Sequence, residues 1–262
     1  MGFHYNDKDF ILGVRRDEAP NTASYRMHTH ETVEIYRFIS GSAVFHVEGS
    51  AYQLQPGDLL VMKPTESHYV ELAENMPYER AVLNVRPEVF ASIDPEGKLF
   101  APILNRAPGT GNRYRDRDFP MGSEHYFRIM CSQEGDPRLN LLCGLVQLLH
   151  AIHSLQDRER ELPDTLEYRI VRYVGDRIRE DVSLEEICRE FFLSKSQLCR
   201  LFRRATATTV RQYITVKRLV LARELMEQGL STTQAALQCG FKDYSVFYRA
   251  WKKHYGTPPS NN

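Results

Sequence analysis

Residues 183–204 read SLEEICREFFLSKSQLCRLFRR, and residues 231–253 read STTQAALQCGFKDYSVFYRAWKK. The two stretches are copies of one pattern, with equivalent positions 48 apart before an internal turn and 49 apart after it: Ser183/Ser231, Ile187/Ala235, Leu193/Phe241, Leu198/Phe247, Arg200/Arg249 and Phe202/Trp251. In each copy, two segments with helical apolar spacing flank a short turn, which is typical of a helix-turn-helix. The repeat therefore predicts two DNA-binding motifs that contact a single DNA site at two places.

Local capping signals predict where the helices of this region begin and end. We predict a first helix over residues 165–179, an N-cap at Ser183 with Glu186 completing a capping box, and a recognition helix over 195–204. A longer helix over 210–228, ended by Gly229, joins the two copies. At 1.5 Å per residue it spans roughly 28 Å, which is close to the ~34 Å between successive major grooves on one face of DNA.

The recognition helices separate into an inner and an outer face. We assign the inner residues to the core: Leu198, Leu201 and Phe202 in the first copy, and Phe247, Ala250 and Trp251 in the second. The outer residues are candidates for reading bases: Ser196, Cys199, Arg200, Tyr244, Ser245, Val246 and Arg249. Nearby cations are candidates for phosphate contact: Lys195, Arg203, Arg204, Lys242, Lys252 and Lys253. For the two base-reading arginines, phosphate contact or a salt bridge remains the alternative.

The net charge of zero over 262 residues conceals an asymmetry. Residues 164–262 carry 17 Lys/Arg and 11 Asp/Glu, whereas the preceding residues carry 17 and 23. A basic region beside an acidic one is expected when a nucleic-acid-binding module is joined to a module that does not bind nucleic acid. The chain has no uncharged apolar run near 18 residues and its five cysteines have no C-x-x-C spacing, so we expect no membrane span, no disulfide framework and a cytoplasmic protein.

The N-terminal half has the pattern of a small β structure. Residues 33–39, 43–47, 58–62 and 79–85 are rich in β-forming side chains and are separated by glycine and proline turn signals. This spacing predicts an all-β barrel or sandwich. Residues 86–122 are interrupted by prolines and glycines and are expected to be irregular, with one or two short helices.

Residues 137–160 have helical apolar spacing that is wider than a single face. Two interpretations remain open for this helix: it packs onto the β domain, or it pairs with its counterpart in a homodimer. The resulting domain organisation is an effector-sensing domain over 1–125, a helical linker and dimerisation segment over 126–162, and an all-α DNA-binding domain over 163–262.

The C-terminal residues contain a recognisable set of positions: Arg218, Ala222, Ala236, Gly240-Phe241, Phe247, Arg249, Lys252, Tyr255-Gly256 and Pro259. This set resembles the signature of the AraC/XylS family of bacterial transcription regulators. The resemblance implies a DNA-binding domain of about seven helices, with both recognition helices in adjacent major-groove segments. The first copy departs from the family at Phe192, where glycine is usual in the turn, and at Cys188 and Ala207. We expect Phe192 to avoid a positive φ and the first turn to differ in geometry.

Residues 27–69 resemble the double-stranded barrel of the cupin superfamily. The series His28-x-His30-x3-Glu34-x6-Gly41 matches the first cupin motif, and Gly57, Pro64 and His68 match the second, in which Glu66 replaces a glycine. If residues 28, 30 and 34 share one face of a strand, two imidazoles and a carboxylate converge, and His68 adds a third imidazole. We leave three roles open for this set: contact with an organic effector, structural hydrogen bonding, and ligation of Fe, Mn, Ni or Zn. Tyr36 is a further candidate for effector contact.

The sequence as a whole predicts a ligand-responsive transcription regulator and not an enzyme. The resemblance implies a bacterial, nucleoid-associated homodimer that activates transcription with RNA polymerase. Its expected partners are double-stranded DNA and a small molecule, for which a sugar is one candidate, and no cofactor is required. The alternative is a metal-dependent cupin enzyme or a metal sensor fused to a DNA-binding domain, which requires His28, His30, Glu34 and His68 to hold a divalent metal.

Overall fold

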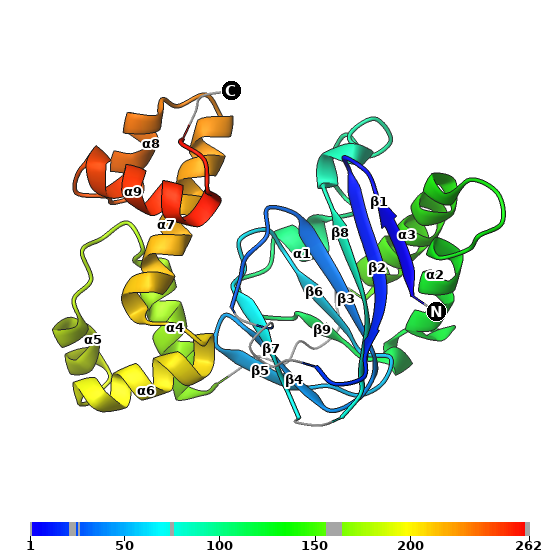
Figure 1. The fold of residues 1–262 in the computed structure, drawn as a ribbon, viewed down its shortest axis with the longest axis horizontal. Helices are drawn as coiled ribbons and strands as arrows, with labels where there is room; N and C mark the ends of the chain where they lie inside the picture. Colours follow the sequence, from blue (N-terminus) through cyan, green and yellow to red (C-terminus); the bar gives the residue numbers. More distant parts are fainter. Residues whose placement is uncertain (1, 21–24, 26, 74–75, 156–163, 260–262) are drawn as a thin grey trace. The chain divides into compact units, whose positions relative to one another are not determined.

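The computed structural model describes residues 2–20, 25, 27–73, 76–155 and 164–259. The chain divides into two compact units, residues 1–163 and 164–262, and each is described by itself (Figure 1). The first unit contains all the described strands, and the second is built from helices alone. The predicted fold class, an all-β N-terminal domain with a helical segment followed by an all-α domain, is therefore confirmed.

Two antiparallel sheets form the first unit. The larger sheet has the order β1-β2-β8-β3-β6-β9 and consists of β1 (Phe3–Asn6), β2 (Phe10–Asp17), β8 (Tyr78–Val85), β3 (Val33–Ser40), β6 (Leu59–Met62) and β9 (Arg113–Tyr114). The smaller sheet has the order β5-β4-β7 and consists of β5 (Ser50–Gln53), β4 (Ala43–Val47) and β7 (His68–Leu72). The four predicted strands correspond to β3, β4, β6 and β8. Residues 86–122 are largely irregular, with β9, α1 (Ala101–Leu104) and the 3₁₀ helices η2 (Pro87–Phe90) and η3 (Asp116–Asp118).

Side chains of the larger sheet alternate between two environments, as the twofold repeat of a strand requires. On β3, Val33 and Ile35 join a cluster with helical residues, whereas Tyr36 joins a second cluster with residues of the smaller sheet. Glu34 also points to the second side, where it lines a cavity. One face of the sheet is thus covered by helices, and the other face forms the site described below.

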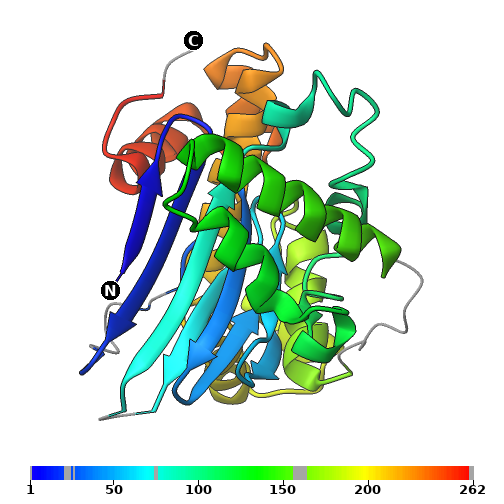
Figure 2. The ribbon, with the colours of Figure 1, turned by 90° about the vertical axis from the view of Figure 1, so that its right-hand side faces the viewer.

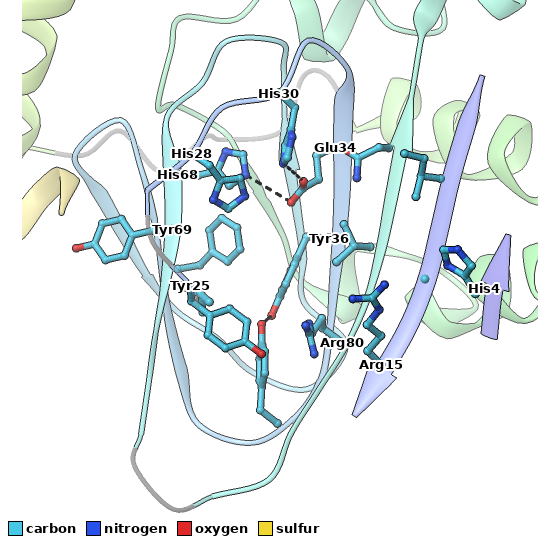
Figure 3. A pocket seen from close by; sticks show the side chains of 17 residues that line it. His4, Arg15, Tyr25, His28, His30, Glu34, Tyr36, His68, Tyr69 and Arg80 are labelled. Carbon is cyan, nitrogen blue, oxygen red and sulfur yellow. Dashed lines mark hydrogen bonds and ion pairs between the residues drawn. The ribbon is translucent and has the colours of Figure 1, made fainter. Parts of the chain in front are cut away.

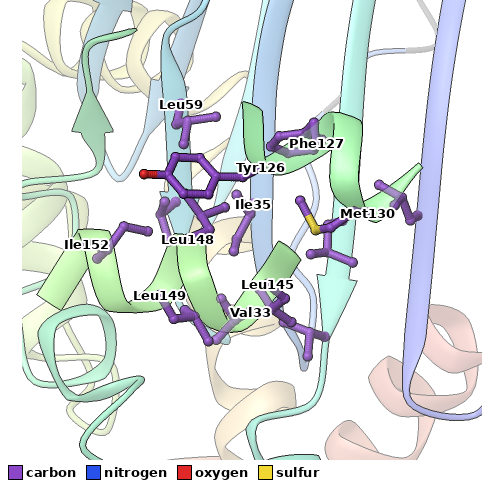
Figure 4. Close-up of a cluster of buried hydrophobic side chains, with 14 of the residues drawn as sticks. Val33, Ile35, Leu59, Tyr126, Phe127, Met130, Leu145, Leu148, Leu149 and Ile152 are labelled. Atoms are coloured by element: carbon purple, nitrogen blue, oxygen red, sulfur yellow. The ribbon is translucent and has the colours of Figure 1, made fainter. Parts of the chain in front are cut away.

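Helices α2 (Gly122–Met130) and α3 (Pro137–Ser154) cover the first face (Figure 2). Leu145, Leu148 and Leu149 of α3 are fully buried among sheet residues and side chains of α2 (Figure 4). Burial of each such leucine stabilises the unit by about 1.5–3 kcal/mol. The two helices approach closely at Gly144, where a Cβ atom would lie 2.8 Å from the carbonyl oxygen of Tyr126.

The segment over 126–162 was predicted as a linker and dimerisation element. In the structure, its described part up to residue 155 shares the core of the larger sheet, and residues 156–162 lie outside the described residues. Packing onto the β domain is therefore the role that the contacts of α3 show. The opposite side of α3 leaves Leu139 and Cys143 exposed.

Six helices form the described part of the second unit: α4 (Leu166–Asp176), α5 (Leu184–Glu190), α6 (Lys195–Thr206), α7 (Val210–Glu227), α8 (Thr232–Gln238) and α9 (Tyr244–Tyr255). The first helix-turn-helix copy is α5-α6 and the second is α8-α9. Each copy has its own core, centred on Phe202 in the first and on Phe247 and Trp251 in the second. The long helix α7 supplies residues to both cores. Among the described helices, none has the combination of length and apolar character needed to cross a bilayer.

The turn of the first copy corrects one expectation. Phe192 has a φ of 54°, in the left-handed region, and its equivalent Gly240 has a φ of 86°. The two turns therefore share a positive φ although the side chains differ. At Gly240 a Cβ atom would lie 2.4 Å from the carbonyl oxygen of Arg179, whereas the Phe192 side chain is 95% exposed. Phenylalanine is accommodated because its ring extends away from the domain, and only the backbone strain of the left-handed conformation remains.

The helix caps follow the sequence with one difference. The side chain of Ser183 accepts a hydrogen bond from the backbone N–H of Glu186, but no reciprocal bond from the Glu186 side chain completes a capping box there. Complete capping boxes occur instead at Ser194 with Gln197 and at Ser231 with Gln234. The same local bonds thus fix the start of α6 and α8, one helix from each copy.

Candidate functional site

A cavity of about 290 Å³ lies in the first unit, on the side of the larger sheet that faces away from the helices (Figure 3). Its lining alternates along the strands, with residues 11, 13 and 15 from β2 and residues 78, 80, 82 and 84 from β8. Tyr25, Tyr36, Phe45 and Tyr78 give it aromatic surfaces. The predicted effector residues His28, His30, Glu34, Tyr36 and His68 all line this cavity.

Three histidines and a glutamate form a cluster in this cavity. Each of His28, His30, Glu34 and His68 offers a ligand atom, and these four atoms lie within 4.8 Å of one another. The residues reach this arrangement in a different way from the one predicted. His28 and His30 precede β3, which begins at residue 33, because the chain bends at residues 31–32. His28 is instead bridged to the first residue of β7 by two backbone hydrogen bonds with His68, of 3.1 and 3.0 Å.

Glu34 is the charged centre of the cluster. Its carboxylate lies 2.8 Å from Nε2 of His30 and 3.6 Å from Nε2 of His68. Burial alone raises the pKa of Glu34, but the charge of His68 and the hydrogen bond from His30 lower it to well below its ordinary value. For His68, burial lowers the pKa, and the charge of Glu34 more than offsets that effect, so the pKa is raised. An ionised Glu34 paired with a protonated His68 is the state that this geometry favours.

A buried carboxylate next to the cluster holds its surroundings in place. Glu66 accepts hydrogen bonds of 2.6 Å from each terminal nitrogen of Arg106, and further ones from the backbone N–H of Gly109 and of Lys63 and from the side chain of Asn112. Burial raises the pKa of Glu66, but Arg106 and these hydrogen bonds lower it by more than burial raises it. The pKa of Glu66 therefore lies below its ordinary value. In the sequence, this buried carboxylate was signalled by the glutamate at a position of the second cupin motif where glycine is usual.

Sequence reasoning missed several polar or charged residues of the cavity, among them Tyr25, Arg15 and Arg80. Tyr25 and Arg15 precede the matched motif, and Arg80 follows it. A charged residue in a strand ordinarily indicates a solvent-exposed face, and no spacing rule pairs residue 15 with residue 80. Only the register of β2 against β8 places the two arginines side by side.

The second unit presents the predicted DNA-contacting residues on exposed helix faces. Leu198, Phe202, Phe247 and Trp251 are buried as expected, and Leu201 and Ala250 are partly buried. All candidates for base reading and phosphate contact are exposed: Ser196, Cys199, Arg200, Tyr244, Ser245, Val246 and Arg249, with Lys195, Arg203, Arg204, Lys242, Lys252 and Lys253. Cys199 is exposed, as its place on the outer face of α6 requires.

A hollow of about 860 Å³ separates the two recognition helices. Cys199 and Arg203 of α6 line one side, and Val246 of α9 and Lys242 before it line the other. Residues 210, 211, 214, 215 and 218 of α7 line it as well. The structure therefore brings candidates from both copies to one concave surface. The remaining candidates lie outside the lining of this hollow.

Several of the candidates for phosphate contact are paired with acidic side chains. Lys195 pairs with Glu185, Arg204 with Glu167, and Lys242 with Asp181. Exposed pairs of this kind contribute little net stability, so a DNA phosphate competes with them at small cost. Arg218 has a structural role that the sequence did not predict, because its guanidinium donates to the carbonyl oxygens of Ile178 and Glu180 and so ties the end of α4 to α7.

Comparison with known proteins identifies the family of each unit. Residues 12–142 match the family described as an AraC-like ligand binding domain, and residues 187–261 match a helix-turn-helix domain. The HTH-type transcriptional activators RhaR of Salmonella dublin and of Salmonella typhi are each 24% identical over 253 residues, which cover 89% of this chain and 85% of the relative. Among solved structures, ToxT from Vibrio cholerae covers 97% of both chains at 16% identity and a TM-score of 0.40. The DNA-binding domain of AdpA, solved with a target DNA, covers 36% of this chain and 85% of that chain, at 21% identity and a TM-score of 0.34.

Proposed function

Because the chain belongs to the AraC family of transcription regulators, with a ligand-binding domain and a helix-turn-helix DNA-binding domain, we propose that it activates transcription in response to a small molecule bound in the cavity of its first unit. The observation that carries the proposal is the convergence of His28, His30, Glu34 and His68 in an aromatic-walled cavity within the matched ligand-binding region. A few convergent polar groups in an otherwise apolar cavity are typical of a small-molecule site. Activation is supported by the similarity to the transcriptional activator RhaR.

A compact, hydroxyl-bearing molecule such as a sugar fits the chemistry of this cavity. A volume of about 290 Å³ lies at the small end of ligand sites. The ionised Glu34 accepts hydrogen bonds from hydroxyl groups, and the aromatic surfaces of Tyr25 and Tyr36 pack against the faces of a sugar ring. The residues proposed to contact the effector are thus His28, His30, Glu34, Tyr36 and His68.

The effector acts through a difference in affinity between two states of the protein. A ligand shifts an equilibrium only as far as it binds one state better than the other. We propose that the protein works as a homodimer on double-stranded DNA, that the occupied cavity favours the state that binds the promoter productively, and that RNA polymerase is its partner there. Coupling of this kind typically changes affinity by about 5- to 150-fold.

Two variants separate effector binding from DNA reading. In Val82→Trp the larger side chain fills the cavity, because Val82 lines it, whereas Arg249→Ala removes an exposed arginine of α9. Ligand binding is measured by calorimetry and DNA binding by fluorescence anisotropy with the full chain, and transcription by a promoter reporter. We expect Val82→Trp to bind DNA but lose its response to the effector, and Arg249→Ala to bind the effector but lose DNA discrimination. An effector that binds the wild type without changing DNA affinity or reporter output would contradict the proposal.

A second candidate function is response to a divalent transition metal held by the same cluster. The favouring observation is the orientation of His68, whose Nδ1–H donates to the carbonyl oxygen of Glu66 at 2.8 Å. That bond directs Nε2 into the cluster, where it is buried and has no hydrogen-bond partner among the described residues. Histidine ligands are oriented in this way by a backbone carbonyl on the other ring nitrogen. Three imidazoles and one carboxylate suit iron, manganese, nickel or zinc, and binding would release the Nε2 proton of His68.

Metal content tests this candidate directly. Untagged protein prepared without chelator is analysed by inductively coupled plasma mass spectrometry, with His30→Ala as the test variant and His150→Ala, an exposed histidine of α3, as the matched control. Near-stoichiometric metal in the wild type and the control, lost in His30→Ala, supports metal sensing. A metal-dependent cupin enzyme additionally requires turnover that disappears with the metal. Negligible metal in all three proteins would leave the organic effector as the only ligand of the cluster.

A further inference from the structure

Two arginines lie directly opposite each other on the wall of the effector cavity. Arg15 of β2 and Arg80 of β8 are register partners in the antiparallel pair, and both side chains line the cavity (Figure 3). Like charges directly opposite each other on one face of a sheet are destabilising. The same sheet pairs charges favourably at the next position, where Arg16 is the register partner of Glu79 and the two side chains lie 3.9 Å apart. The arrangement of Arg15, which is exposed, and Arg80, which is partly buried, therefore favours an anion beside them.

The protein supplies only part of that compensation. Arg80 pairs with Asp17 at 2.6 Å, and its guanidinium lies over the rings of Tyr25 and Tyr78, at 5.4 and 4.9 Å from their centroids. Arg15, in contrast, has no hydrogen bond or ion pair with another described residue, although its charge helps to lower the pKa of Asp17. One guanidinium in the cavity wall is thus left without a counter-ion in the described part of the chain.

The rest of the cavity does not neutralise this charge. Glu34 is the one carboxylate among the residues found to line it, and His30 and His68 already pair with Glu34. The cavity therefore combines a cationic wall on β2 and β8 with the His and Glu cluster. Within that cluster the histidines and Glu34 already pair with one another. Arg80 is partly buried and Arg15 is exposed, and a cleft lined by charges of one sign concentrates counter-ions.

We propose that the effector carries a carboxylate, held by Arg15 and by the free side of the Arg80 guanidinium, while its hydroxyl groups face Glu34. The chemical class is a small polyhydroxy acid, such as a uronic or aldonic acid, instead of a neutral sugar. A planar guanidinium binds a carboxylate through two parallel N–H···O bonds. A monoanion matches the charge better than a phosphate dianion, because Asp17 already offsets one of the two arginines. This inference rests on the proposed function of the cavity as an effector site.

The first test needs no knowledge of the natural effector. Arg15→Gln removes one of two opposed charges, so we expect the ligand-free full-length protein to melt at a higher temperature than the wild type. Arg16→Gln is the matched control, because Arg16 is the next residue of the same strand and pairs on the other face with Glu18 and Glu79; its melting temperature should be equal or lower. Replacing chloride by acetate at constant ionic strength should raise the melting temperature of the wild type and of Arg16→Gln, but not that of Arg15→Gln.

The second test compares matched ligands by calorimetry and thermal shift: galacturonate with galactose, glucuronate and gluconate with glucose, and glucose 6-phosphate as the dianion. We expect the acids to bind the wild type more tightly than their neutral partners, and Arg15→Gln to lose about tenfold or more in affinity for the acids only, as the loss of a charge-assisted hydrogen bond predicts. Preference for the phosphate, equal binding of neutral sugars, or no stabilisation by acetate or any of the acids would each overturn the inference. Neutral sugars that bind and alter DNA affinity would overturn it while leaving the proposed function intact.

Discussion

His68 donates its Nδ1–H to the carbonyl oxygen of Glu66 at 2.8 Å, while the Glu66 side chain is clamped by Arg106 through two hydrogen bonds of 2.6 Å. One residue thus links the polar cluster of the cavity to a fully buried ion pair. The side chains of Glu66 and Arg106 are each 1% exposed. The orientation of His68 in the cavity is therefore fixed by a network that lies outside the cavity lining.

Replacement of Glu66 should destabilise the first unit strongly. In Glu66→Gln the charge of Arg106 remains buried without its partner, and loss of one member of a buried pair costs about 3–5 kcal/mol. Glu71→Gln is the matched control, because Glu71 is exposed on β7 and pairs with His46 at 3.3 Å; its cost should be under about 1 kcal/mol. Urea unfolding followed by far-ultraviolet circular dichroism measures both. Equal stability of the two variants would contradict the assigned role of Glu66.

The same pair should determine part of the acid sensitivity of the protein. The folded-state pKa of Glu66 is lowered from its ordinary value of 4.5. A carboxyl group with a lowered pKa contributes stability that is fully present above its unfolded value and is lost as the pH falls through the folded value. We expect the free energy of unfolding of chelator-treated wild-type protein to fall below about pH 4.5, and Glu66→Gln to show a shallower fall over the same range. An identical slope in the two proteins would show that Glu66 is not among the groups that titrate.

The two equivalent turns should respond in opposite ways to substitution. Gly240→Ala should destabilise the second helix-turn-helix copy, because its φ is 86° and the new Cβ would lie 2.4 Å from the carbonyl oxygen of Arg179. Phe192→Asn should be neutral or stabilising by up to about 1 kcal/mol, because asparagine adopts the left-handed conformation at less cost than phenylalanine. Trp251, the single tryptophan of the chain, reports unfolding of the second copy by fluorescence, and far-ultraviolet circular dichroism reports the helices of both copies. Destabilisation by Phe192→Asn as large as that by Gly240→Ala would show that the exposed ring is needed for folding.

Two cations of α9 should affect DNA binding differently. Arg249→Ala should reduce specific binding by ~1–3 kcal/mol and relax discrimination at one part of the site, as the loss of a base contact does. Lys252→Ala should weaken binding to all sequences alike and lower the slope of log K against log salt concentration by about one. Fluorescence anisotropy titrations on cognate and scrambled DNA at several salt concentrations distinguish the two effects. Unchanged discrimination in Arg249→Ala would assign that arginine to the phosphate backbone.

The sequence predicted best where local signals determine the structure. The helices of the second unit begin at serine, threonine and aspartate caps that bond to backbone within three residues, so their starts at Ser194 and Asp243 were readable from the sequence. The φ of Phe192 was predicted wrongly, because the steric preference of phenylalanine for a negative φ does not take account of the structure around the turn. The domain needs the same positive φ in both turns, and the exposed position of Phe192 leaves room for its ring.

The cavity was predictable only in part. The spacing of His28, His30, Glu34 and His68 indicated a shared site, and the structure brings their ligand atoms together. The reason for this convergence was not the predicted strand face but the bridge between His28 and His68. Arg15 and Arg80 could not be paired from the sequence, because 65 positions separate them and the contact depends on the register of β2 against β8. Long-range register is set by packing of the whole sheet and leaves no local pattern.

Selection of binding sites from a random DNA library by the full-length protein tests the central claim, that two equivalent recognition helices read one DNA site. We predict enrichment of a sequence with two conserved segments about one helical turn, roughly 10 base pairs, apart. Arg200→Ala should lose conservation in one segment and Arg249→Ala in the other, because the two arginines occupy equivalent positions on α6 and α9. A single conserved segment that is insensitive to one of these variants, or no enrichment at all, would contradict the account.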